Sequence, residues 1–191
     1  MKKESFLLSI ILICSAMNIH AQDDLLKLVE DDKPKREYVD YAFKSSRVIM
    51  SHSLEIIRPG VMDMRILHRF GNINGGAYEF FGLDNATMRL GFDFGLIKNL
   101  MIGIGRSTNR KEIDGFLKYR LIHQSKNGGL PFSLLFVAGS SLNTLKFTDS
   151  TRKNYFSSRM GFYGQTIIGS KISEGFTLQL MPTIVHRNLV P

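Results

Sequence analysis

Histidine and serine are the residues of this chain best suited to catalysis or metal binding. Four of the five histidines follow residue 21, namely His52, His68, His123 and His186. Each stands alone, without the His-x-x-x-His spacing that places two ligands on one face of a helix. The nearest candidate pairs, brought together across strands, are His68 with Asp63 or Asp84 and His52 with Ser51 or Ser53. We expect single histidines of this kind to be solvated or hydrogen-bonded, and not catalytic.

Glycine and cysteine motifs give no support to an enzyme either. The chain has neither the Gly-x-Ser-x-Gly turn of a serine nucleophile nor a Walker-type phosphate loop. The glycines of Gly103-Ile104-Gly105 fall inside a predicted strand, where they cannot cradle a phosphate. The one cysteine, Cys14, precedes a predicted cleavage site, so the mature chain would have no thiolate and no disulfide. The sequence predicts a protein that is not an enzyme and has no catalytic residue, cofactor or metal site.

A two-residue alternation of apolar and polar side chains indicates the elements that carry these residues. The clearest run sets Met88, Leu90, Phe92 and Phe94 against Thr87, Arg89, Gly91 and Asp93. Successive side chains of a strand point to opposite faces, so this strand is apolar on one face and polar on the other. Beyond residue 21 no stretch offers the ~18 consecutive apolar residues of a helical span. A bilayer could then be crossed only by a closed barrel.

About eight strands can be placed from this alternation. They cover residues 43–56, 62–70, 87–96, 100–106, 113–121, 132–139, 156–165 and 176–184. Tight turns near Pro59, Lys98 and Ser173 alternate with longer loops after Gly71, Ser107 and Ser140. Bacterial barrels show this parity, with short turns on the periplasmic side and long loops outside. The predicted fold class is therefore all-β, an antiparallel up-and-down transmembrane β-barrel.

The last predicted strand does not fit this count. If the strand at 43–56 runs toward the Pro59 turn, the eighth strand runs outward and the chain stops at Pro191 on the outside. An even-numbered barrel should instead end in the periplasm. Either the first segment is not a spanning strand or the barrel is incomplete. We expect incompleteness, with further strands beyond Pro191.

The N-terminal residues predict export. Lys2 and Lys3 precede an apolar run over 6–13, and a polar stretch leads to a cleavage site after Ala21, so residues 1–21 read as a signal peptide. Residues 22–42 form a charged periplasmic linker or short helix, and residues 43–191 the β-barrel domain. Attachment of lipid at Cys14 is the alternative, although bulky Ile13 before it fits that processing poorly.

The formal net charge of +8 requires a partner. Nucleic acid does not fit, because Lys and Arg are spread along the chain and export removes it from nucleic acid. Anionic headgroups of outer-membrane lipid, or a lumen that attracts anionic solutes, explain the charge equally well. A solvated face with a surplus of cations is the alternative.

Two groups of residues are candidate lumen or loop positions. The first is a set of cations on inward strand positions: Arg65, Arg89, Lys118, Arg120 and Arg159. They would form a cationic interior, or else pair with Asp63, Asp93 and Asp114 into a closed salt-bridged plug. The second group is Tyr78, Phe80 and Phe81 in the glycine-rich loop 70–85. These aromatics would contact a ligand or constrict the lumen, unless the loop is external and packed on its own rings.

Several segments resemble a known family. They are DMRILHRFGNINGG at 63–76 and YEFFGLDNATMRLG at 78–91, with GIGRS at 103–107, DGFLKY at 114–119 and HRNLVP at 186–191. Together they are similar to an uncharacterised outer-membrane β-barrel family of Bacteroidota that is catalogued as a domain of unknown function. The resemblance covers nearly all of the mature chain. It implies an outer-membrane barrel and supplies no activity.

Two classes of function follow from these expectations. In the first, a barrel in the cell outer membrane passes or binds small polar or anionic solutes. In the second, the barrel is a non-conducting structural or interaction module whose loops meet a partner. A soluble periplasmic ligand-binding β-barrel, with its apolar face turned inward, is the alternative to both.

Overall fold

The computed structural model of the chain describes residues 36–146 and 155–188. The predicted signal peptide at 1–21 lies outside the described residues, and so does the predicted linker except for residues 36–42. Contacts divide the chain into a unit at 1–37 and a unit at 38–191. The second unit carries all of the β-structure discussed below.

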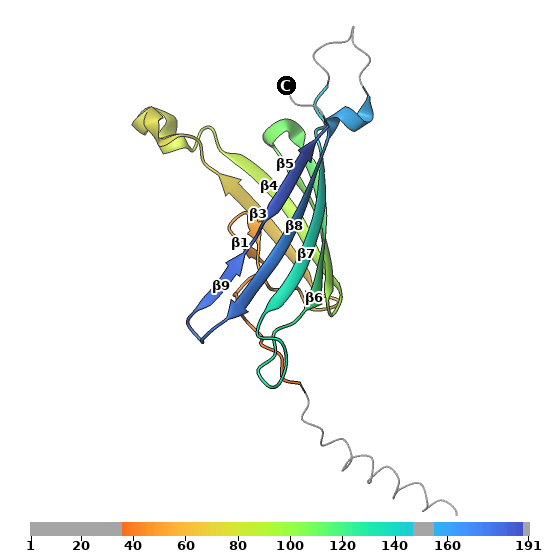
Figure 1. Ribbon diagram of the computed structural model, residues 1–191. Helices are drawn as coiled ribbons and strands as arrows, with labels where there is room; N and C mark the ends of the chain where they lie inside the picture. Colours follow the sequence, from red (N-terminus) through yellow and green to blue (C-terminus); the bar gives the residue numbers. More distant parts are fainter. Residues whose placement is uncertain (1–35, 147–154, 189–191) are drawn as a thin grey trace, which may run out of the picture. The chain divides into compact units, whose positions relative to one another are not determined.

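A curled antiparallel sheet of eight strands forms most of this unit (Figure 1). Its eight strands are β3 (Met62–Arg69), β4 (Thr87–Ile97), β5 (Leu100–Ser107), β6 (Ile113–Ile122), β7 (Ser133–Leu142), β8 (Met160–Lys171), β9 (Thr177–Leu180) and β10 (Thr183–Arg187). From β3 to β8 each strand pairs with the next one along the chain, as in an up-and-down barrel. In the described part of the chain, β3 and β10 do not pair, so the sheet is open.

The last two strands both lie along β8, as two halves of one interrupted strand. β9 pairs with β8 through Leu180 and Ile168, and β10 resumes at Thr183 opposite Gln165. Pro182 stands at the break, where it has no N–H to donate but still accepts a hydrogen bond from the Thr166 N–H at 3.1 Å. Pro182 therefore interrupts the strand between β9 and β10.

Short and long connections alternate only in part as predicted, because the β6–β7 connection at 123–132 is longer than the β5–β6 connection at 108–112. Short turns join β4 to β5 and β8 to β9, and the long loops contain the 3-10 helices η1 (Ile73–Gly82), η2 (Asn109–Lys111) and η3 (Phe156–Arg159). The three helical loops lie at the same end of the sheet (Figure 1). We call this the loop end and the opposite one the turn end. The predicted seventh strand began at Phe156, whereas the chain forms η3 there and β8 begins at Met160.

The two faces of the sheet carry the predicted side chains. Leu90, Leu178 and Leu180 are exposed on the convex face, whereas Asp93 and Lys118 are buried on the concave face. A soluble barrel would bury the apolar face instead. The arrangement therefore matches a wall that turns its apolar side toward lipid. Within the described residues, no helix is long and apolar enough to cross a membrane.

The first predicted strand, at 43–56, is wrong. The chain instead forms the two-residue strands β1 (Arg47–Val48) and β2 (Ser51–His52), which pair as a tight hairpin. The hairpin reverses at Ile49, which has a positive φ of 55° and is 86 % exposed. A spanning strand would need ~9–11 residues in continuous extension. The first segment thus does not span, and the sheet formed by the described strands is also open, as expected of an incomplete barrel.

A cluster of apolar side chains is buried on the concave face, beside the buried polar residues. Leu54 joins inward residues of the strands in one cluster with Met101, Phe116, Leu135, Val137 and Ile167. Leu135 and Val137, inward residues of β7, are fully buried in this core. Gly103 makes room for it, because a Cβ there would overlap the Phe116 ring and the Asp93 carboxylate.

Candidate functional site: the cation-lined concave face

Residues 38–57 lie on the concave side of the sheet, and we call them the inserted segment. At the turn end, Tyr38 pairs with Ser125 and the Val39 N–H donates to the Gln124 carbonyl at 2.9 Å. The His123 ring stacks on the Tyr38 ring with centroids 4.7 Å apart. Burial, and to a lesser degree the nearby Arg120, lower the pKa of His123 below its ordinary value of 6.5.

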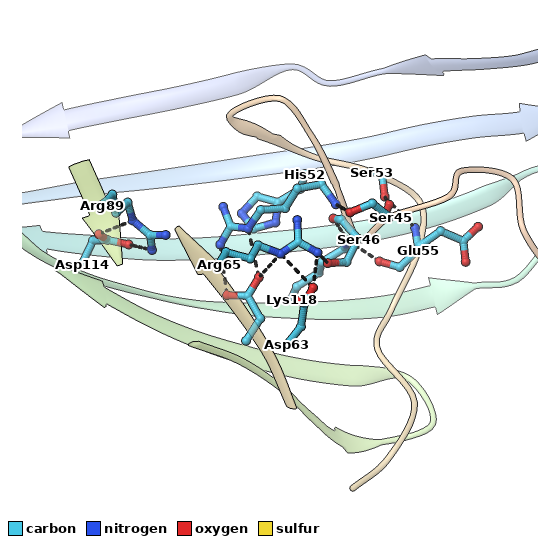
Figure 2. Close-up of polar contacts among 12 residues, drawn as sticks. Ser45, Ser46, His52, Ser53, Glu55, Asp63, Arg65, Arg89, Asp114 and Lys118 are labelled. Carbon is cyan, nitrogen blue, oxygen red and sulfur yellow. Dashed lines mark hydrogen bonds and ion pairs between the residues drawn. The ribbon is translucent and has the colours of Figure 1, made fainter. Parts of the chain in front are cut away.

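Two cations of β6 bind the backbone of the inserted segment. The Lys118 Nζ donates to the carbonyl oxygens of Ser46 at 3.1 Å and Glu55 at 2.5 Å (Figure 2). Two residues further along β6, Arg120 donates to the Leu54 carbonyl at 2.9 Å. Both cations are buried. They were predicted to line a lumen, and they do face it, but both donate hydrogen bonds to carbonyl oxygens of the chain itself.

Asp93 is the buried carboxylate at the centre of the face. Its Oδ2 lies 3.0 Å from Nε of Arg47, which comes from β1, and 3.8 Å from Nε of Arg65, which comes from β3. The Arg47 guanidinium also sits over the Phe116 ring, 4.6 Å from its centroid. A buried carboxylate needs partners of this kind to remain charged. Asp93 thereby ties the inserted segment to the wall.

The remaining predicted cation–acid pairs also form. Arg65 bonds Asp63 and donates to the Ser46 Oγ at 3.0 Å (Figure 2). Arg89 donates to both carboxylate oxygens of Asp114, at 2.8 and 2.5 Å, in the fork geometry that favours such pairs. The predicted salt-bridged plug, which used Asp63, Asp93 and Asp114, therefore describes this face better than an open cationic pore.

His52 is held in the interior between two aromatic side chains. Its ring lies 4.5 Å from the Phe116 ring, and its Nε2 is 3.3 Å from the Tyr163 hydroxyl. Ser53 donates instead to the Ser45 carbonyl at 2.5 Å. His68 and Asp63 have opposite parity on β3, so they lie on opposite faces of the sheet. Within the described residues, no three His, Cys, Asp or Glu side chains gather as metal ligands.

Arg159 lies apart from this network, at the loop end. It lines a pocket of about 650 Å³ with three further cations, Arg110, Lys146 and Arg187, and one acid, Glu112. Ser141, Ser158 and Thr183 add hydroxyl groups to the same wall. The structure therefore divides the five predicted cations into four on the filled concave face and one in a separate pocket.

The predicted aromatic residues lie outside the lumen. Tyr78 is 95 % exposed, and Phe80 and Phe81 are more than half exposed on η1. The predicted constriction of the lumen by these rings is therefore wrong. The alternative of a loop packed on its own aromatics does not describe them either, because the rings are open to solvent.

The inserted segment is the functional feature that sequence reasoning missed. Its contribution to the face is chiefly Arg47 and the carbonyls of Ser46, Leu54 and Glu55. Backbone acceptors leave no trace in residue types. The available signal was the pair of inward cations on β6, Lys118 and Arg120, which share that strand with only one acid, Asp114.

Comparison with known proteins gives one match. The model of a family described as "Membrane bound beta barrel domain (DUF5777)" matches residues 43–191. No curated protein and no solved structure matches the chain.

Proposed function

The chain belongs to this family of membrane-bound β-barrel domains, and we propose that it is an outer-membrane barrel whose own N-terminal segment fills the lumen, so that it does not conduct. The observation that carries this proposal is the capture of buried Lys118 and Arg120 by the carbonyls of residues 46, 54 and 55. A conducting pore would keep its inward cations in water, free to meet passing ions.

Packing supports the same conclusion. Leu54 of the inserted segment belongs to the apolar core of the wall, and the backbone at Ile57 and Arg58 lies against Gly95 so closely that a Cβ there would overlap it. Asp93 adds the buried ion pair to Arg47. Apolar contact, hydrogen bonds to carbonyl oxygens and ion pairing thus act together to keep the segment in place.

Planar-bilayer recording of the purified protein tests the proposal. We expect no steady conductance from the wild type. The double variant Lys118→Met/Arg120→Leu removes both carbonyl donors and should raise the frequency of open events, whereas exposed Lys44→Met should stay silent. A steady anion-selective current through the wild type, reduced by Arg89→Ala, would contradict the proposal and favour solute passage.

The outer-membrane location rests on the exposed apolar convex face and on the export signal read from the sequence. Fractionation of cells tests it directly. Recovery in the outer-membrane fraction supports the proposal, and recovery in the soluble periplasm would favour a soluble ligand-binding barrel.

The loop-end pocket supports a second candidate function, the binding of small anionic solutes without passage. Four cations, Arg110, Lys146, Arg159 and Arg187, face one acid there, so the local charge attracts anions. Titration calorimetry in detergent with pyrophosphate and citrate tests it. We expect binding that weakens with salt and with Arg187→Gln, and that is unchanged by Arg69→Gln outside the pocket. Heat signals that Arg187→Gln leaves intact would overturn it.

A further inference from the structure

The loop between β3 and β4 is a compact unit that extends away from the sheet (Figure 1). Its base is closed by a hydrogen bond of 2.7 Å from the Gly71 N–H to the Gly82 carbonyl. Gly82 has a positive φ of 91°, and a Cβ there would overlap the Gly71 carbonyl. Only glycine can adopt this φ and also leave room for the Gly71 carbonyl, so the closed base requires glycine at position 82. The hydrogen-bonded base therefore fixes the position from which the loop presents its side chains.

The loop exposes large apolar side chains. Tyr78 is 95 % exposed, Phe80 64 % and Phe81 59 %, and Ile73 and Leu83 are exposed beside them. Scattered apolar residues are ordinary on a surface, whereas a cluster of this size on one short loop marks a contact surface.

Two neighbouring residues of the cluster also hold an unfavourable backbone. Phe80 has φ 44° and ψ 48°, and Phe81 has φ 54° and ψ 35°. Bulky residues rarely adopt this left-handed region, and successive ones are rarer still. Consecutive strained residues persist when the conformation they enforce is useful. Here it displays two phenyl rings at the tip of the loop.

Lipid is the occupant that the surroundings indicate. The convex face of β3 leads toward the loop through exposed Met62, Met64 and Ile66. The row ends at His68, whose ring packs edge-on against Phe70 at 5.0 Å. The aromatic loop therefore continues the apolar surface that the barrel already turns toward acyl chains. Aromatic side chains are enriched where such a surface meets the headgroups.

The two charged residues of the loop, the acids Glu79 and Asp84, are compatible with this position because both can stay in the hydrated headgroup layer. Glu79 receives a hydrogen bond from the Asn85 amide at 3.4 Å, at the end of the loop that joins β4. A carboxylate at that height lies in the hydrated headgroup layer, and the rings lie beside the acyl chains.

We propose that the η1 loop is a membrane-surface anchor in which Tyr78, Phe80 and Phe81 insert at the boundary between headgroups and acyl chains of the adjacent leaflet. The anchor would fix the depth and tilt of the barrel. It is independent of whether the lumen conducts.

Tryptophan fluorescence tests the anchor cleanly, because the chain contains no tryptophan. Phe80→Trp is reconstituted into phosphatidylcholine vesicles with bromine at a shallow or a deep acyl position. We expect blue-shifted emission and quenching at least about twofold stronger by shallow bromine than by deep bromine. Leu90→Trp on the convex face should be quenched more evenly, and Tyr41→Trp on the inserted segment should be little quenched.

Emission from Phe80→Trp that matches the unfolded protein and resists both quenchers would overturn the proposal. The exposed aromatic side chains would then be assigned to a contact with a protein partner or with a second copy of this chain. Tyr78→Trp repeats the measurement outside the strained pair, so a folding defect of the first variant leaves the test in force. Circular dichroism of each variant confirms the sheet before fluorescence is read.

Discussion

The Nζ of Lys118 lies 2.5 Å from the backbone oxygen of Glu55, which joins the wall of the barrel to the segment inside it. The same ammonium reaches the Ser46 carbonyl at 3.1 Å, so one side chain clamps both arms of the β1–β2 hairpin. Each cation of this type normally needs a carboxylate when buried. Here backbone carbonyl oxygens, which carry partial negative charge, take the place of the carboxylate.

Lys118→Met should loosen the inserted segment. The Ser46 carbonyl still receives the Ser53 N–H at 3.1 Å, but the Glu55 carbonyl loses its ammonium partner. An unsatisfied buried carbonyl costs about 1–3 kcal/mol. Urea unfolding in detergent should show a loss of this size, with Lys44→Met near zero as the exposed control. Equal stability of the two variants would contradict the clamp.

Gly95→Ala should disturb the same contact from the other side. Gly95 exchanges hydrogen bonds with Gly60 and Val61 at 2.9 and 3.0 Å, and an added Cβ would overlap the Ile57 and Arg58 carbonyls. Overpacking of this kind costs about 1–3 kcal/mol. Gly164→Ala is the matched control, because nothing lies within 4 Å of its Cβ position. The contact is refuted if the two alanines unfold at the same urea concentration.

Asp93→Asn should be the most damaging change among the ion pairs. Asp93 is buried and binds Arg47 closely, so its loss leaves the Arg47 guanidinium with a neutral partner, whereas Arg65 keeps Asp63. Breaking a buried pair from one side costs about 3–5 kcal/mol. Asp63→Asn, in a more exposed pair, should cost about 1 kcal/mol or less. Chemical unfolding of both variants measures the difference, and the reverse order would contradict the burial of Asp93.

The attachment at the turn end should depend on pH. Burial lowers the pKa of His123 below 6.5, so the unfolded chain binds its proton first as the pH falls. Stability is complete above pH 6.5 and is lost as the pH drops from 6.5 toward the lowered value. His123→Gln should flatten this part of the profile. Unfolding midpoints between pH 8 and pH 5 test it, and parallel profiles for the two proteins would exclude a role for His123.

Alternation predicted the wall because each strand meets lipid on one side and the lumen on the other. Leu90 and Arg89 illustrate this, since their exposure and their ion pairing follow from parity alone. The inward direction of Lys118 and Arg120 was predicted by the same rule. The positions of the chain reversals were predicted for a similar reason, because a reversal such as the one at Gly60, with φ of 76°, carries local residue signals.

The inserted segment escaped prediction because its conformation depends on distant partners. Val48 and Met50 have the two-residue spacing of one face of a spanning strand, yet the chain reverses between them at Ile49. The hairpin is held by Lys118, Asp93 and other wall residues that lie far away in sequence. Strain at Phe80 and Phe81 was equally hidden, since nothing in a phenylalanine pair predicts a positive φ.

Thiol labelling of the inserted segment tests the filled lumen most directly. In a Cys14→Ser background, Ser53→Cys places a thiol at a position with 0 % exposure, and Met50→Cys places one on the same hairpin at 56 %. In the folded protein we expect a membrane-impermeant maleimide to label Met50→Cys rapidly and Ser53→Cys only after addition of urea. Equal and rapid labelling of both cysteines in the folded state would show that the segment lies in water, and would contradict the account.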